Sequence, residues 1–149
     1  MKSMRETKDV RETTIDAKGL VLGRMASTVA KRLLNGERIN IVNAEEAVIS
    51  GKRLSILKES KEFLQVGHFR KGPLHHRRPD RIVKKVVRGM LPRKKPRGAK
   101  ALGRLKVYIG VPGELRDKEL ETISQLDARN LRGPYIKVSE LASNIGWKE

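Results

Sequence analysis

Positive charge is concentrated in one stretch of this chain, more strongly than in most globular proteins. Residues 67–106 contain 15 Lys and Arg residues and a single acidic residue, Asp80. They carry 14 of the 17 net positive charges of the 149-residue chain. Such an excess costs stability through self-repulsion. The usual physical reason to tolerate it is a polyanionic partner, most often a nucleic acid.

A run of charge is also typical of a solvated or disordered segment. Glycines and prolines are spread through residues 67–106, between stretches that have the pattern of ordered elements. This spacing favours shaped loops over a disordered tail. We therefore predict that the stretch binds a polyanion.

Composition limits the class of protein. Apolar residues make up 38% of the chain, which is enough for a modest core. There is no cysteine, and no apolar run approaches the roughly 18 residues of a membrane span. The charged first residues predict no secretory signal. We expect a cytoplasmic protein with a loose N-terminal arm over residues 1–13 and a single α/β domain over 14–149, whose extension 113–149 is slightly acidic.

Hydrophobic periodicity predicts alternating strands and helices in the first half of the chain. Apolar residues keep helical spacing over 22–34, and Gly36 stands where a C-terminal glycine cap is expected. Residues 38–43 are rich in β-branched side chains and predict a strand. The remaining predictions here are a short strand at 14–17 and a helix over 52–65, which a short apolar run at 47–49 precedes.

The clearest amphipathic pattern is a helix from Pro79 to about Met90. One stripe is apolar and is expected to enter the core: Ile82, Val83, Val86, Val87 and Met90. The other stripe offers four cations: Arg81, Lys84, Lys85 and Arg88. Basic loops are predicted on both sides of it, at 66–78 and 93–100, the second followed by a short helical turn.

The second half of the chain completes the predicted sheet. Residues 105–111 are almost continuously apolar, which predicts a strand buried on both faces of a parallel sheet. Residues 114–129 are interpreted as mixed-charge helical surface, 135–138 as a strand and 139–146 as a short helix. The predicted fold class is α/β, with a small, mostly parallel sheet flanked by helices and with long basic loops.

No constellation for catalysis or for a cofactor is found. Residues 67–72 imitate the start of a phosphate-binding loop, but Pro73-Leu74 stand where Lys-Ser/Thr would be needed. His75-His76 have no cysteine or nearby carboxylate pair to complete a metal shell. The sequence therefore predicts neither an enzyme, nor a metal, nor a cofactor. A small nucleotide-dependent enzyme remains a competing hypothesis that this broken pattern disfavours.

Aromatic residues make up only 3% of the chain. Modules that read single strands depend on aromatic stacking platforms, so stacking is not expected as the main mode of binding. We expect contact with the phosphates and 2′-hydroxyls of structured RNA. One of these few aromatic residues, Tyr108, lies inside the predicted buried strand, which also argues against stacking.

Several separated blocks resemble one known family in order and spacing. The main pair is 87–94 (VRGMLPRK) followed by 105–112 (LKVYIGVP). Three more blocks agree: 16–17 (DA) with 22–27 (LGRMAS), 42–45 (VNAE) with 50–52 (SGK), and 77–80 (RRPD). Over about residues 15–112 the chain resembles the universal L-thirteen family of large-ribosomal-subunit proteins. The tail after Pro112 resembles its archaeal and eukaryotic branch.

The resemblance implies a structural protein of the large subunit, without catalytic activity, that acts early in assembly. Its implied partners are large-subunit rRNA and neighbouring ribosomal proteins, and its implied place is the cytoplasmic ribosome. No membrane, no small-molecule substrate and no homo-oligomer are expected. The alternative is a free regulatory protein that binds RNA or DNA outside the ribosome.

The predicted RNA-binding residues lie at two helix starts, in the basic loops and on the cationic helix. They are Arg24, Lys52, Arg53, His68, Arg70, Lys71, His75, His76, Arg77, Arg78, Arg81, Lys84, Lys85, Arg88, Arg93, Lys94, Lys95, Arg97, Lys100 and Arg104.

Overall fold

The computed structural model describes residues 10–149. The elements in chain order are β1 (Glu12–Asp16), α1 (Leu22–Leu34), β2 (Arg38–Val42), β3 (Val48–Ser50), α2 (Arg53–Gln65), α3 (Pro79–Gly89), α4 (Pro96–Gly103), β4 (Leu105–Val107), β5 (Leu120–Glu121), β6 (Tyr135–Lys137) and α5 (Val138–Asn144). The arm predicted for residues 1–13 falls largely on residues 1–9, outside the described residues. Its end is ordered, since β1 begins at Glu12.

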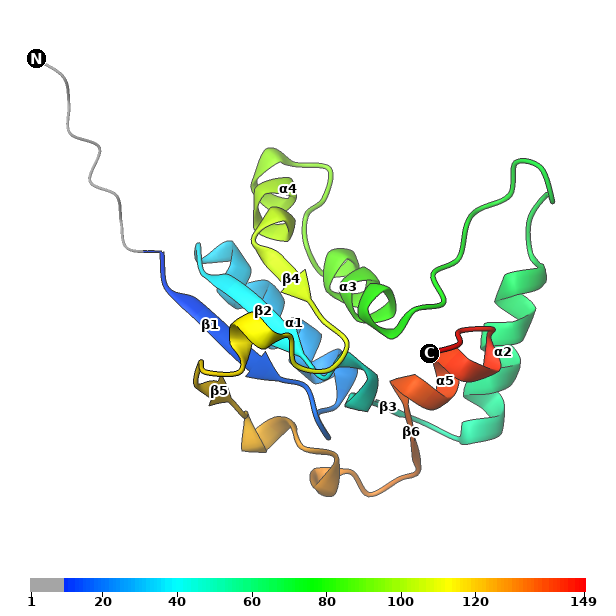
Figure 1. Cartoon of the computed structure of the whole chain (residues 1–149). Helices are drawn as coiled ribbons and strands as arrows, with labels where there is room; N and C mark the ends of the chain where they lie inside the picture. Colours follow the sequence, from blue (N-terminus) through cyan, green and yellow to red (C-terminus); the bar gives the residue numbers. More distant parts are fainter. Residues whose placement is uncertain (1–9) are drawn as a thin grey trace, which may run out of the picture.

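Four strands form a parallel sheet in the order β4–β2–β1–β5. β1 and β2 pair along their whole length, from Glu12 opposite Arg38 to Asp16 opposite Val42. The crossover between them is α1, which lies behind the two strands in Figure 1. β3 and β6 form a separate antiparallel pair. The predicted α/β class with a small, mostly parallel sheet is confirmed.

α1 is the helix that the sequence predicted, with the same bounds. The six apolar positions at helical spacing are all buried against the sheet and α3: Leu22, Met25, Ala26, Val29, Ala30 and Leu33. Gly36 follows the helix with a φ of 101°, a left-handed conformation that costs glycine little. The local pattern and the final structure therefore agree for this helix.

α3 also forms as predicted, with Pro79 in its first turn. Val83 and Val87 are fully buried, while Ile82 and Val86 are only partly buried at the edge of the core. The predicted place of Met90 in the apolar stripe is wrong, since 44% of this residue is exposed. It lies just after the helix, where the chain turns away from the core toward α4.

The strand predicted over 105–111 is shorter and less buried than expected. β4 covers three residues and is an edge strand that pairs with β2 alone. After it the backbone keeps irregular hydrogen bonds to the end of β2, since the Tyr108 N–H donates to the Ile41 carbonyl at 2.8 Å. The chain then turns at Gly110, which takes a φ of 65° and whose N–H donates to the Glu45 carboxylate at 3.0 Å. Tyr108 is therefore half-buried beyond the strand rather than inside it.

The segment 114–129, interpreted above as helical surface, contains no α-helix. It forms 3-10 turns at Gly113–Leu115, Ser124–Leu126 and Ala128–Asn130, with β5 between the first two. In Figure 1 it runs below the sheet and returns through β6 to α5. Its mixed charges suit a surface position, but its few apolar residues do not keep helical spacing.

α2 and α5 lie to one side of the sheet (Figure 1). The helix predicted over 52–65 is confirmed, but within it only Leu57 is buried. Leu57 packs with Ile136, Leu141 and Ile145 in a second small cluster. α2 is thus weakly embedded, and it leaves apolar side chains such as Phe63 partly exposed.

Candidate nucleic-acid interface

The cationic side of α3 points away from the core. Arg81, Lys84, Lys85 and Arg88 are all exposed, because the opposite side of the helix holds Val83 and Val87. None of these four cations forms a salt bridge within residues 10–149. Their charges remain available to an external anion.

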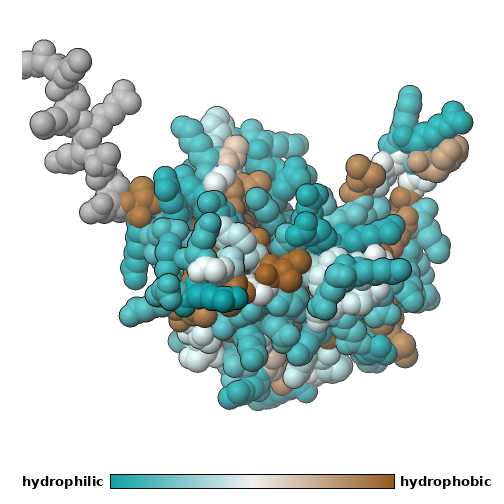
Figure 2. All heavy atoms as spheres, in the orientation of Figure 1, coloured by the Kyte–Doolittle hydropathy of each residue, from teal (hydrophilic) through white to brown (hydrophobic). Residues whose placement is uncertain are grey.

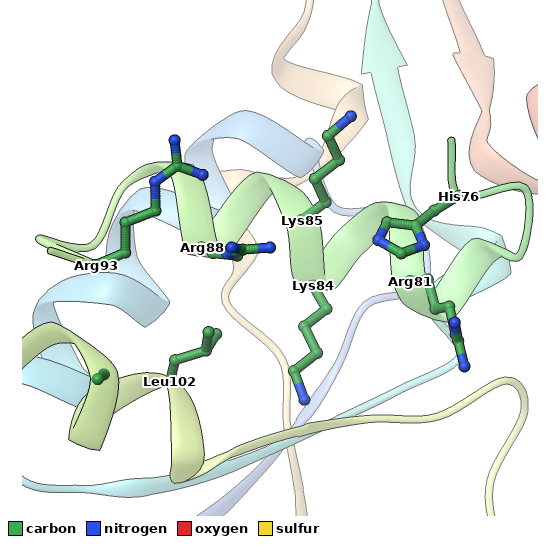
Figure 3. Close-up of a pocket in the computed structure, with 8 residues that line it drawn as sticks. His76, Arg81, Lys84, Lys85, Arg88, Arg93 and Leu102 are labelled. Carbon is green, nitrogen blue, oxygen red and sulfur yellow. The ribbon is translucent and has the colours of Figure 1, made fainter. Parts of the chain in front are cut away.

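These cations border an open hollow of about 500 Å³ between α3 and α4. We call it the cationic hollow; its lining is His76, Arg81, Lys84, Lys85, Arg88, Arg93, Ala99 and Leu102. Figure 3 shows His76 at one end of α3 and Arg93 at the other, with side-chain nitrogens projecting between them. No carboxylate lines the hollow, so its positive potential is not neutralised from within.

Loop 91–95 and the start of α4 are held by a close backbone contact. A Cβ on Gly98 would lie 2.1 Å from the Pro92 carbonyl oxygen, closer than real atoms approach. Only glycine fits there, and this contact fixes Arg93 at the edge of the cationic hollow. The basic loop predicted over 93–100 is therefore too long. α4 begins at Pro96, so Arg97 and Lys100 are exposed helical residues.

Loop 66–78 extends from the body between α2 and α3 (Figure 1). At its tip the Gly72 N–H donates to the His68 carbonyl, and a Cβ on Gly72 would clash with that oxygen. The His68 ring stacks on Phe69 with centroids 5.0 Å apart, and the Arg70 guanidinium lies 5.3 Å from the Phe69 ring. Figure 2 shows apolar and hydrophilic side chains together on this protruding loop.

Three of the predicted contact residues are engaged inside the protein. Arg53 pairs with Glu140 of α5. A guanidinium nitrogen of Arg104 donates to the Leu33 carbonyl at the end of α1. These contacts hold neighbouring elements together, so we leave both residues out of the proposed interface. Arg78 lies 3.2 Å from Asp80 of α3, and its side chain is about as exposed as that of Arg53.

The other predicted residues are exposed, except the half-buried His75, but they are not all near one another. Arg24 lies near the start of α1 and Lys52 precedes α2, away from the lining of the cationic hollow. Lys71 and Arg77 belong to loop 66–78, and Lys94 and Lys95 to loop 91–95. The Arg77 guanidinium lies beside Gly146 at the end of α5, which favours a cation there.

Some cations outside the basic stretch are tied to carboxylates, among them Arg32 and Lys137. Arg32 of α1 donates from Nη1 to Glu121 at 3.0 Å and from Nε to Glu37 at 2.9 Å. Burial lowers the pKa of Arg32, but these hydrogen bonds outweigh it and the pKa is raised. The hydrogen bond to Glu46 likewise raises the pKa of Lys137. These pairs join α1 to the segment that contains β5, and β6 to the turn that follows β2.

Glu12 of β1 is a third group whose pKa is shifted. Its carboxylate accepts a hydrogen bond from Asn40 Nδ2 at 2.8 Å and lies 3.3 Å from the ammonium of Lys118. The bond from Asn40, followed by the contact with Lys118, lowers the pKa of Glu12. These contacts join β1, β2 and the segment before β5.

Within residues 10–149, no group of three or more His, Asp or Glu side chains is arranged to hold a metal ion. In the same part of the chain, no helix has the length and apolarity needed to span a bilayer.

Comparison with known proteins identifies the family. A sequence profile described as Ribosomal protein L13 matches residues 11–114. The chain belongs to the ribosomal protein L13 family. The large ribosomal subunit protein uL13 of Methanosarcina barkeri is 54% identical over 138 residues, covering 91% of this chain and 99% of the relative. The uL13 protein of Aeropyrum pernix is 43% identical over 145 residues, covering 94% and 93%.

The resemblance described in the sequence is therefore confirmed for this L13-family chain. A third archaeal relative, uL13 of Methanococcoides burtonii, is 46% identical over 137 residues. The profile ends at residue 114, soon after the last of the resembling blocks, whereas the archaeal relatives also match much of the segment that follows.

One feature of the site could not be found from the sequence. Phe63 of α2 lies beside His75 of loop 66–78, with ring centroids 4.4 Å apart. The ammonium of Lys85 lies 5.2 Å from the same ring. No local pattern connects these residues, because the contact depends on how α2 packs beside α3.

Proposed function

We propose that this chain is a structural component of the large ribosomal subunit that binds large-subunit rRNA through the cationic hollow and the two loops beside it. The observation that supports this most directly is the lining of that hollow. Six cationic or imidazole side chains surround it and no carboxylate does. In a member of a ribosomal protein family, the polyanion that matches this surface is rRNA.

The contacts proposed for the hollow are with phosphates. Arg81, Arg88 and Arg93 carry planar guanidinium groups suited to bidentate phosphate binding. Lys84 acts as a more flexible point charge. Each contact releases counterions from the RNA, and together they fix the position of the protein without reading sequence.

The loops extend this surface beyond the hollow. The proposed further contacts are His68, Arg70, Lys71 and Arg77 on loop 66–78 and Lys94, Lys95, Arg97 and Lys100 around the start of α4. The α/β body holds the two regions at a fixed separation, because α3 joins them and packs on α1 and β4. A protein of this form can bring RNA segments together early in assembly while having no catalytic activity of its own.

The proposed partners are rRNA and neighbouring large-subunit proteins, without a small-molecule substrate, a cofactor or a second copy of the chain. As a large-subunit protein it is a component of cytoplasmic ribosomes. The alternative is a free regulator that binds RNA or DNA. Such a protein would also need the excess of positive charge, but it would not be stably bound to the large subunit.

A sucrose gradient of native lysate, probed for this protein at low salt and again after a high-salt wash, separates the two. We expect retention in the large-subunit peak through the wash, since an integral component makes many contacts. Release into the top fractions at low salt would favour the free regulator and overturn the proposal.

A further inference from the structure

We infer that an apolar hollow next to the cationic hollow receives one unstacked nucleobase of the bound RNA. The apolar hollow has a volume of about 470 Å³ and lies among α2, α3 and α5. Its apolar lining is Phe63, Leu64, Ile82, Val86, Leu141 and Ile145. This inference rests on the proposed RNA-binding function and names the part of the RNA that the site takes.

The two hollows share two lining residues. His76 and Lys85 line both of them, and Figure 3 shows Lys85 and Lys84 projecting to opposite sides of α3. Lys85 is thus directed to the apolar hollow while Lys84 remains with the cationic one. A nucleotide has the same two-part character, because a base with apolar faces is linked through its sugar to a phosphate. With its phosphate at this boundary, its base would enter the apolar hollow.

The interior of the apolar hollow has the groups that hold a base. Phe63 is 53% exposed, so much of its ring is available for stacking. His75 Nε2 is buried and has no hydrogen-bond partner within the described residues. An unpaired buried nitrogen is costly, and a polar edge of the base would satisfy it. Glu59 and Ser60 supply further polar groups at the rim.

A protein segment is the other possible occupant, and the observations favour the base. The apolar hollow adjoins the cationic hollow, which no carboxylate lines, and the ammonium of Lys85 already lies 5.2 Å from the Phe63 ring. An apolar peptide would leave that cation without a partner. A nucleotide would give it a phosphate. Stacking on a single ring also agrees with the small number of aromatic residues, since only one base is bound.

The test measures binding of the full chain to protein-free large-subunit rRNA from Methanosarcina barkeri, with excess tRNA as competitor and at several salt concentrations. Phe63→Ala is expected to weaken binding roughly 5- to 100-fold, the range for loss of one stacked base. The salt dependence should not change, because no phosphate contact is removed. Leu54→Ala is the matched control, since Leu54 is also an exposed apolar residue of α2 but lies outside the hollow.

A second variant keeps the test independent of any effect of the alanine on folding. Phe63→Trp combined with Trp147→Phe leaves a single tryptophan in the hollow. Its emission should be quenched on addition of the rRNA if a base stacks on it. Full-strength binding by Phe63→Ala, or unquenched emission while the RNA is bound, would overturn the inference and leave the proposed function intact.

Two other results are also decisive. If Phe63→Ala binds rRNA normally but is lost from large subunits in the sucrose gradient, a protein segment occupies the hollow and the inference is wrong. If the wild-type protein itself shows no salt-dependent binding to the rRNA, the proposed function fails and this inference fails with it.

Discussion

Neutralising the cationic hollow should flatten the salt dependence of RNA binding by a calculable amount. The variant carries glutamine at Arg81, Lys84, Arg88 and Arg93. All four line the hollow, and none has a carboxylate partner within residues 10–149. Lys85 is left unchanged because it lies beside Phe63.

The magnitude follows from counterion release. Each phosphate contact contributes about 0.7 to 0.9 to the slope of log K against log salt. Loss of four contacts should therefore lower the slope by about 3. When the salt rises from about 50 to about 200 mM, RNA binding by the wild type should therefore weaken roughly 60-fold more than RNA binding by the variant.

The control must remove the same charge elsewhere. Glutamine at Lys18, Arg116, Arg129 and Arg132 also lowers the net charge by four, and all four residues are exposed and outside the lining of the hollow. Fluorescence anisotropy with labelled rRNA at four or five salt concentrations gives both slopes. If the two variants have equal slopes, only net charge matters and the proposed interface is wrong.

Three further predictions concern the body that holds this surface. Gly98→Ala should lower the free energy of unfolding by about 1–3 kcal/mol, because the added methyl group overpacks against Pro92. The urea midpoint of unfolding should fall. An unchanged midpoint would show that this contact does not require glycine. Arg32→Ala should lower the free energy of unfolding by about 1–2 kcal/mol, because it releases Glu121 from α1. Amide hydrogen exchange in β5 should become faster. Unchanged exchange would mean that the ion pair does not hold this edge of the sheet. Because the pKa of Glu12 is lowered in the folded protein, Glu12 contributes stability above the ordinary glutamate pKa of about 4.3, and this stability is lost as the pH falls through the lower pKa of the folded protein. The stability of Glu12→Gln, measured between about pH 5 and 3, should therefore fall less than that of the wild type. Parallel profiles of stability against pH would contradict the assignment.

Much of the fold could be predicted because its determinants are local. α1 has the predicted bounds, since its six apolar residues repeat at helical spacing and Gly36 caps it. The cationic side of α3 was equally evident, because one acid among 15 cations leaves little to pair with them inside the stretch. Within the apolar stripe, however, the sequence did not distinguish the fully buried Val83 and Val87 from the partly buried Val86 or the exposed Met90.

The errors occurred where a specific contact that hydrophobic periodicity does not show decides the outcome. Residues 105–111 have the composition of a buried strand, but β4 ends at Val107 and the chain turns at Gly110, whose N–H donates to the distant Glu45 carboxylate. The helix α4 was predicted as part of a loop, since its first turn depends on the approach of Gly98 to Pro92.

The sequence by itself determined that the chain has an α/β body, that its excess of positive charge lies within residues 67–106, and to which family it belongs. These properties depend on composition, periodicity and the order of motifs, all of which are local in the chain. The tertiary structure decided which cations remain free. Arg53 and Arg104 are engaged by partners far away in the sequence, while residues as distant as His76 and Arg93 line one hollow. Such contacts follow from how α2, α3 and α4 pack around the sheet, because pairing and burial depend on distances in space and not along the chain.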